Sequence, residues 1–379
     1  MNPLQRPPTA IVMLNLGGPE TLDAVRPFLM RLFADHEIMP LPFQRWLGPF
    51  IAERRTPKVR ERYAAIGGGS PILHWTRLQG QGMADWLDRI SPETAPHRFY
   101  VAFRYTPPFA EDALRQMAAD GVRRAVAFTQ YPQFSCTTTG SSLNELWRAA
   151  EREGLEDAFH WSVIDRWPLH PGFLQSLAES IRAGLESFPA EERGQTMLLF
   201  SAHSLPMSVV KRGDAYPPEI EATVQAVMGL VGRQQPYRIC YQSSVGPVPW
   251  LGPSTDDTIR ELGKHGQRNV LVVPVAFTSD HIETLHEIDI EYGELAHAVG
   301  IRNFKRAPAF NGSPTFQRAL AEVVAAHLRS GETCSAQYGQ RCKGCSNPYC
   351  QTILQPATGL PQVAPQEEVQ EEATYAGLD

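Results

Sequence analysis

The chain has 379 residues, of which 42% are apolar and 20% are charged, a composition that is ordinary for a globular protein. Its formal net charge of −6 argues against nucleic-acid binding, and its length predicts two domains or one two-lobed unit. No apolar run reaches the ~20 residues that span a bilayer and no secretory signal opens the chain, so we expect a soluble or peripheral protein in a reducing compartment.

The first half of the chain alternates predicted strands and helices. A Gly-Gly-Pro turn ends the first strand, and Pro27 suggests a kink in the first helix. Apolar runs predict strands at 9–16, 98–105, 123–131 and 159–167. Helices are predicted at 21–35, 110–121, 141–154 and 172–188.

The second half repeats this alternation. Strands are predicted at 195–205, 237–244, 268–279 and 304–310. Helices are predicted at 219–232, 254–266, 283–300 and 313–331. Near-continuous apolar strands between helices indicate parallel sheets covered on both faces. The α/β pattern, split near 185–195, therefore predicts two doubly wound lobes.

Ligands of such folds bind beyond the carboxyl ends of the strands, and several unusual segments fall there. His203 ends one strand between small residues, so it is either a satisfied structural histidine or a catalytic one. Asp280 and His281 end another strand. Glu283, Glu287 and Glu291 then recur every four residues, which in a helix forms one acidic row. The row is either a solvated face or a route for a cation or a proton.

Two segments between the first helix and the strand at 98–105 are irregular. Residues 39–57 are apolar, aromatic and interrupted by prolines, which is typical of a membrane contact, of the lip of an apolar pocket, or of a connecting loop packed on the body. The glycine-rich segment 67–70 is either a turn that needs positive φ or a ligand loop.

Cysteines gather near the end of the chain. Cys342, Cys345 and Cys350 have the spacing C-x2-C-x4-C, which suits an iron–sulfur cluster at least as well as zinc. The fourth ligand is either Cys334, which proximity favours, or Cys136 in a strand-end loop. Residues 355–379 contain acids but no Lys or Arg, and we expect a disordered acidic tail.

Long motifs distributed over residues 9–353 resemble the ferrochelatase family, and most closely its animal-type members. They are LNLGGPET, IGGGSPI, FRYTPP, TQYPQFSCTTTGSSLNEL, DRWPLH, FSAHSLPMSVVKRGDAYP, QSSVGPVPWLGPSTDDTI and VPVAFTSDHIETLHEIDIEY. The resemblance implies two Rossmann-like lobes with a porphyrin cleft between them. It also implies the terminal step of haem biosynthesis, in which Fe²⁺ enters protoporphyrin IX and two protons are released.

The resemblance also implies roles for individual residues. The catalytic positions are His203, Asp280, His281 and Glu283, with less support for His170 and Glu322. The positions that line the porphyrin cleft are Arg55, Tyr63, Ser70 and Leu16, with Arg104 and Tyr105 on the face opposite the histidine. Glu287 and Glu291 continue a proton or metal path. Our hypothesis is that His203 accepts pyrrole protons and that metal enters near Arg104; the reverse assignment competes with it.

For the fourth cluster ligand, the family resemblance implies Cys136 in place of Cys334, which proximity in the sequence favours. It implies a [2Fe–2S] cluster bound by Cys136, Cys342, Cys345 and Cys350, with Cys334 spare. The animal members have Met at the position of Leu16 and Lys at the position of Ser244, and they carry a presequence that we do not see here.

We expect a lobe at 1–190 with a porphyrin lip at 39–57, a lobe at 191–330, and a cluster-binding extension at 331–354. The expected partners are protoporphyrin IX, Fe²⁺, a second copy in a homodimer and a membrane surface. The expected location is the bacterial cytoplasm or, for a mature eukaryotic form, the mitochondrial matrix. Rival hypotheses are a chelatase for coproporphyrin or another divalent metal, and a non-catalytic carrier of haem or of a cluster.

Overall fold

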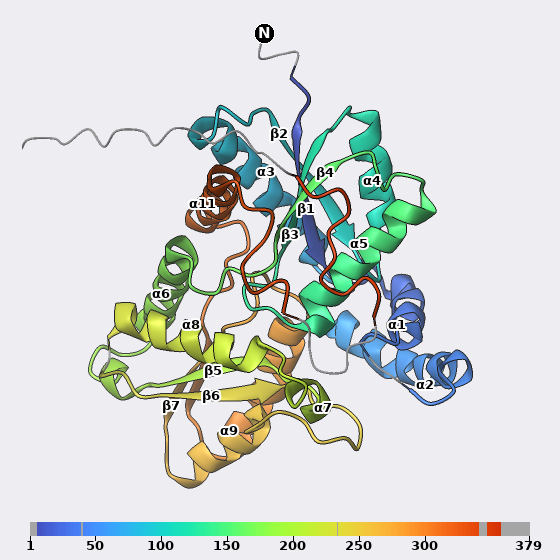
Figure 1. The fold of residues 1–379 in the computed structure, drawn as a ribbon. Coiled ribbons are helices and arrows are strands. Elements are labelled where there is room, and N and C mark those ends of the chain that lie inside the picture. Colours follow the sequence, from blue (N-terminus) through green and yellow to red (C-terminus); the bar gives the residue numbers. More distant parts are fainter. Residues whose placement is uncertain (1–5, 39–40, 233, 341–346, 358–379) are drawn as a thin grey trace, which may run out of the picture.

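Two four-stranded parallel sheets form the framework of the molecule (Figure 1). The computed structural model describes residues 6–38, 41–232, 234–340 and 347–357. The first sheet has the order β2 (His97–Phe103), β1 (Thr9–Asn15), β3 (Arg124–Thr129), β4 (His160–Ile164). The second has the order β6 (Tyr237–Gln242), β5 (Met197–His203), β7 (Asn269–Pro274), β8 (Asn303–Arg306). The predicted pair of parallel, doubly wound sheets is therefore confirmed.

Helices cover these sheets. Those of the first half of the chain are η2 (Leu22–Ala24), α1 (Val25–Ala34), α2 (Gln44–Ala65), α3 (Ile72–Ile90), α4 (Ala110–Ala119), the π-helix η3 (Cys136–Gly140), α5 (Ser141–Arg152) and α6 (Pro171–Glu186). Those of the second half are η4 (Arg193–Gln195), α7 (Met207–Val210), α8 (Tyr216–Val231), α9 (Thr255–Lys264), the π-helix η5 (Glu283–Tyr292), α10 (Gly293–Ala298) and α11 (Pro314–Ser330).

The central strand β1 shows why the strands have continuous apolar sequences. All seven of its residues are buried, and side chains alternate between the two faces of the sheet. Ile11 and Met13 pack in one core with α3, α6 and α11, whereas Val12 and Leu14 pack in another with α4 and α5. Both faces of the sheet are therefore covered by helices, which removes the polar alternation of a half-exposed strand.

Helices also tie the two lobes together. Helix α6 precedes the second sheet in the chain but packs against α8 and β7, and α11 returns from the end of the second lobe to pack against α3. A Cβ at Gly82 of α3 would lie 2.1 Å from the Gln317 side chain of α11, so the two helices approach closely there. The lobes share one hydrophobic core, because the same cluster contains Ile11 of β1 and Phe200 of β5.

Two local expectations were wrong, and one helix was missed. Residues 44–65 form the continuous helix α2 in place of an irregular lip, although Pro49 and Pro57 lie inside it. Gly48 lets that helix pack closely on α1, since a Cβ there would lie 2.6 Å from the backbone oxygen of Phe33. Residues 72–90 form α3, which we did not predict. Pro27 does not kink α1, because it lies in the first turn, where an amide hydrogen has no helical partner.

The C-terminal extension adds itself to the free edge of β4 (Figure 1). Trp161 of β4 donates its backbone N–H to Gln355 at 2.9 Å and accepts from Ala357 at 2.8 Å. Val163 donates to Thr333 at 2.7 Å. These bonds cover an edge strand whose backbone groups would otherwise be open to pairing with another chain.

Candidate active site

The carboxyl ends of β5, β6 and β7 bring four of the predicted site residues together. His203 is the last residue of β5, Gln242 is the last of β6, and the segment after β7 leads into η5, which begins at Glu283. Because the strands are parallel, their carboxyl ends meet at one edge of the sheet. The polar side chains there are held by a fully hydrogen-bonded strand framework.

Glu283 lies between two histidines. Its Oε2 is 3.3 Å from Nδ1 of His203 and 3.5 Å from Nε2 of His281. Nδ1 of His281 lies 2.9 Å from the backbone oxygen of Ser279, which can only accept, so that nitrogen carries the proton. His281 therefore presents Nε2 to the carboxylate in a fixed orientation.

Burial and mutual contact separate the pKa values of this group. Burial alone lowers the pKa of His203, but the neighbouring carboxylate of Glu283 outweighs it, and the pKa of His203 is raised above its ordinary value. Burial alone raises the pKa of Glu283, but His203 and His281 outweigh it and lower the pKa strongly. The pair is therefore an imidazole that holds a proton more tightly beside a carboxylate that stays ionised.

Glu287 follows Glu283 by four residues on η5. Its carboxylate accepts hydrogen bonds from the hydroxyl of Ser243, from Nε2 of Gln242 at 3.1 Å and from the hydroxyl of Tyr292 at 3.0 Å. Burial and the charge of Glu283 raise the pKa of Glu287. Glu287 can therefore hold a proton next to a carboxylate that does not.

The third carboxylate of the predicted acidic row has a different partner. Glu291 accepts from Arg62 of α2 at 2.6 Å, and this ion pair joins η5 to the first lobe. The expectation of an ordinary α-helix for this segment was wrong, because residues 283–292 adopt the wider turns of a π-helix with i→i+5 bonding.

Asp280 is held by contacts with three neighbouring side chains. Its carboxylate forms an ion pair with Arg306 at 3.0 Å. It also accepts hydrogen bonds from Nδ2 of Asn311 at 2.8 Å and from the hydroxyl of Thr284 at 3.0 Å. Arg306 also binds Asp289 through two bonds of 2.8 and 2.9 Å. One largely shielded guanidinium thus binds a carboxylate before η5 and another within it, a role that the sequence pattern did not reveal.

The first lobe presents a second polar group. Arg104 and Tyr105 follow β2, and both bind the carboxylate of Asp35, the tyrosine hydroxyl at 2.6 Å. The backbone N–H of Leu16 donates to the hydroxyl of Tyr131 at 2.8 Å. Burial raises the pKa of Tyr131, and the charges of Glu283 and Arg104 both act on it. Tyr131, which we did not predict, thus lies between the two polar groups.

The remaining cleft residues come from α2 and the turn after it. Tyr63 is 2% exposed, and burial together with the charge of Glu283 raises its pKa. Ser70 and Asp280 line one cavity of about 450 Å³, with Gly67, Gly69 and Leu285, so residues of both lobes form its wall. Arg55 is half-buried with its guanidinium 5.7 Å from the ring of Phe33, and burial lowers its pKa.

His170 and Glu322 form a separate pair. The charge of Glu322 acts on His170, whose pKa is lowered by burial. Glu322 itself accepts from Arg318 at 2.8 Å on α11. No contact joins either residue to His203 within the described part of the chain, so the structure does not bring them into the same group.

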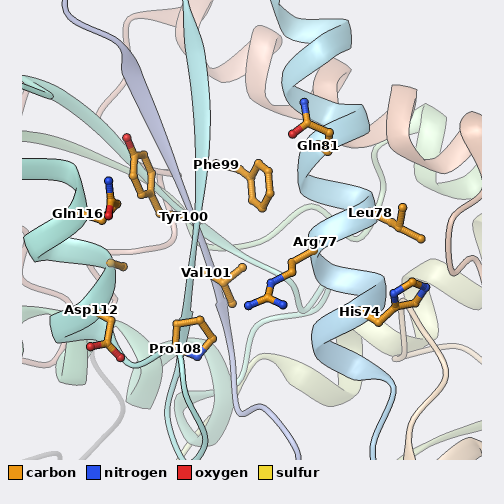
Figure 2. Close-up of a pocket in the computed structure, with 11 residues that line it drawn as sticks. His74, Arg77, Leu78, Gln81, Phe99, Tyr100, Val101, Pro108, Asp112 and Gln116 are labelled. Carbon is orange, nitrogen blue, oxygen red and sulfur yellow. The ribbon is translucent and has the colours of Figure 1, made fainter. Parts of the chain in front are cut away.

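A further groove of about 540 Å³ lies away from these residues, over the edge strand β2 between α3 and α4 (Figure 2). Arg77 projects toward it from α3, and Asp112 and Gln116 lie on α4 across from it (Figure 2). No predicted site residue lines it. Of the two cavities, only the smaller one is lined by predicted site residues, namely Ser70 and Asp280.

Two of the predicted cluster ligands, Cys342 and Cys345, lie outside the described residues. Of the others, Cys350 is buried, and the backbone N–H of Cys136 donates to Asp214 at 2.9 Å. Burial raises the pKa of the Cys334 thiol, and Asp165 and Glu332 raise it further. Within the described ranges, no three His, Cys, Asp or Glu side chains are arranged to hold a metal ion.

The described helices include none that is both long and apolar enough to cross a membrane.

Comparison with known proteins identifies relatives over most of the chain. The family model described as Ferrochelatase matches residues 8–328. "Ferrochelatase, mitochondrial" of Xenopus laevis is 56% identical over 347 residues, which cover 91% of this chain and 84% of the relative. The Homo sapiens protein of the same name is 54% identical over 347 residues, covering 91% and 82%. That of Dictyostelium discoideum is 48% identical over 377 residues, covering 93% and 89%.

Proposed function

Because the chain belongs to the ferrochelatase family, we propose that it inserts Fe²⁺ into protoporphyrin IX, giving protohaem and two protons. This is the terminal step of haem biosynthesis. The observation that carries the proposal is the His203–Glu283–His281 group at the meeting strand ends, because metal insertion requires a base that removes the two pyrrole protons.

In this proposal, His203 accepts the protons. Its raised pKa makes it a stronger base than an ordinary imidazole, and Glu283 balances the positive charge that forms. Glu287, whose raised pKa favours the protonated form, is the next acceptor along η5. The direction of proton flow is then away from the cleft, from His203 past Glu283 to Glu287.

In the same proposal, the metal ion enters from the wall of the cleft opposite His203. Fe²⁺ approaches near Arg104 and Tyr105, where Asp35 and the hydroxyl of Tyr131 offer the oxygen ligands that suit this ion. The porphyrin lies between the walls, with Arg55, Tyr63 and Ser70 as contacts. Binding energy from such contacts can supply the ring distortion that exposes the nitrogen lone pairs.

Mixing the protein with Fe²⁺ and protoporphyrin IX without oxygen, and recording the haem spectrum, tests the proposal. We expect turnover by the wild type and a loss of about 10²–10⁴-fold in His203→Ala, the range typical of general base catalysis. His160→Ala replaces an exposed histidine at the start of β4 and is expected to behave as the wild type. Near-normal turnover in His203→Ala would contradict the proposed role, and absence of haem with the wild type would contradict the function.

We propose that Cys136, Cys342, Cys345 and Cys350 hold a [2Fe–2S] cluster. Thiolates are the ligands that such clusters use. A chain of contacts also links the extension to the turn that carries Cys136. Asn347 of the extension binds Glu37, and Glu37 lies 3.8 Å from Arg104. Arg104 in turn binds the backbone oxygen of Ser141, which directly follows η3. The cluster would supply a covalent tie between extension and body, and no step of the proton chemistry needs it.

The exposed face of α2 supports a peripheral membrane position. Phe43 is 85%, Trp46 74% and Phe50 58% exposed, and their spacing places them along one side of the helix start. The animal relatives are named as mitochondrial, and we propose an inner membrane surface facing a reducing compartment for this chain as well. A homodimer, which only the family resemblance suggests, stays a prediction.

Vesicle sedimentation checks the membrane proposal. Phe43→Ser with Trp46→Ser is expected to lower partitioning into phospholipid vesicles at least about tenfold, because two large apolar side chains lose their burial. Leu230→Ser removes an exposed apolar side chain at the end of α8 and serves as the control, with partitioning unchanged. Equal partitioning of the double variant and the wild type would exclude this face as the contact.

A further inference from the structure

Glu37, which follows α1, is hydrogen-bonded to the cysteine-rich extension. Its Oε1 accepts from Nδ2 of Asn347 at 3.0 Å, although the two residues are 310 positions apart. Asn347 lies between Cys345 and Cys350 in the sequence. Glu37 is therefore one of two acidic acceptors for this part of the extension, the other being Glu151 of α5, which binds the hydroxyl of Tyr349 at 2.6 Å.

The same carboxylate faces the cleft arginine. Its Oε2 lies 3.8 Å from the guanidinium of Arg104. The backbone N–H of Glu37 also donates to Asp35 at 2.8 Å, and Asp35 is the carboxylate that binds both Arg104 and Tyr105. Side chain and backbone of Glu37 thus both act on the acidic surroundings of Arg104.

Helix α5 completes the arrangement. Arg148 binds Oε1 of Glu37, and Nδ2 of Asn144 donates to Oε2 at 3.1 Å. Arg104 in turn donates to the backbone oxygen of Ser141, the first residue of α5. The side chain of Arg104 is only 6% exposed, so water cannot replace a lost partner easily. A displacement of Glu37 must therefore be felt by the guanidinium.

We propose that Glu37 is a positioning residue, through which the docking of the extension at Asn347 sets the geometry of Arg104 in the porphyrin cleft. This inference rests on the proposed function, because it gives the extension an effect on the wall of the cleft where, in that proposal, Fe²⁺ enters. Glu37 itself touches neither substrate. It acts through Arg104, by balancing charge and by fixing the segment that carries Asp35.

Asn347→Asp is the sharpest variant, because it keeps the shape of the side chain but removes the donor and places a second carboxylate against Glu37. We expect kcat/KM for Fe²⁺ to fall about tenfold, the KM for porphyrin to stay within about twofold, and the visible absorption of the cluster to remain.

Gln355→Ala is the matched control. Gln355 also lies in the extension and also donates an amide hydrogen bond to an acidic side chain of the body, Asp157, but it does not contact the Glu37 group. Its kinetics are expected to match those of the wild type. A fall in kcat/KM equal to that of Asn347→Asp would mean that any loosening of the extension suffices, and would overturn the specific role of Glu37.

Glu37→Gln and the double variant with Asn347→Asp complete the experiment. If both residues act through one hydrogen bond, the double variant loses no more kcat/KM than Glu37→Gln alone. Additive losses would overturn the proposal.

Hydrogen exchange keeps the test independent of the proposed activity. Asn347→Asp should speed amide exchange in residues 35–37 and at Arg104 and Tyr105, and Gln355→Ala should not. Unchanged exchange there overturns the inference, whether or not the wild type makes haem. A wild type that makes no haem, with exchange that responds as expected, overturns only the proposed function.

Discussion

Burial and charge act in different ways on three side chains of the candidate site. His203, Glu283 and Glu287 all lose water, which by itself would favour the neutral form of each. The close His203–Glu283 contact reverses that preference for both partners, while Glu287, beside an ionised carboxylate, is driven further toward its protonated form. The two neighbouring carboxylates on η5 thus differ in their tendency to hold a proton.

The pH dependence follows from this contact. The base form of His203 is lost as the pH falls through its pKa, which Glu283 raises above the ordinary value of about 6.5. Glu283→Gln removes the carboxylate that raises the pKa of His203, so the burial that lowers this pKa is largely unopposed. We therefore expect the acid limb of kcat/KM to move to lower pH, besides a lower maximum. Profiles recorded from pH 5 to 9 check this.

Glu291→Gln is the control for that profile, because Glu291 pairs with Arg62 and does not act on His203. Its acid limb should stay in place. An acid limb that does not move in Glu283→Gln, or that moves to higher pH, would show that His203 is not the group whose protonation limits kcat/KM.

The element on which the site depends most is the π-helix η5. It carries Glu283 and Glu287, and Arg306 of β8 binds Asp280 before it and Asp289 within it. Arg306 is 11% exposed, so its two ion pairs are largely shielded from water. The wide turns of this helix are thus held by ion pairs to a guanidinium from β8, another element of the same lobe.

Arg306→Met tests that support. It keeps much of the side-chain volume but leaves two carboxylates without their partner, and we expect the free energy of unfolding to fall by about 2–3 kcal/mol. Denaturant titration measures the loss. Arg26→Met breaks an exposed pair with Glu53 and should change stability little. Equal effects of the two variants would mean that Arg306 does not hold η5.

At the scale of the whole molecule, the C-terminal extension joins parts that are distant in the chain. It pairs with the edge of β4, its Ser335 binds the buried Asp165 through backbone and side chain, and its Asn347 reaches Glu37. The proposed cluster would add a fourth connection, to the turn at Cys136. The described parts of the extension, residues 331–340 and 347–354, therefore contact the body of the molecule without the proposed cluster.

Two cysteine variants distinguish the proposed ligand set. Cys136→Ser should abolish the visible absorption of the cluster, because it removes a thiolate, whereas Cys334→Ser should leave it intact. The raised pKa of Cys334 agrees with a thiol that stays protonated. The reverse result would assign the fourth ligand to Cys334, as proximity in the sequence first suggested.

Particular elements show where sequence reasoning failed. Helix α3 has apolar residues such as Leu73, Met83 and Leu87 at helical spacing, and this signal could have been found. Helix α2 was less accessible, because its prolines argue against a helix and its packing on α1 is a tertiary contact. Tyr131 and Arg306 lacked any local signal, since their partners lie far away in the sequence.

The sequence by itself determined the alternation of strands and helices, the two parallel sheets and the strand-end position of His203, because periodicity and turn residues are local properties. The family motifs then predicted the other cleft residues. Only the tertiary structure decided that Glu283 lies between two histidines, that Glu291 pairs across the lobes, and that Glu37 joins the extension to Arg104. Those contacts depend on distances between remote segments, which no local pattern encodes.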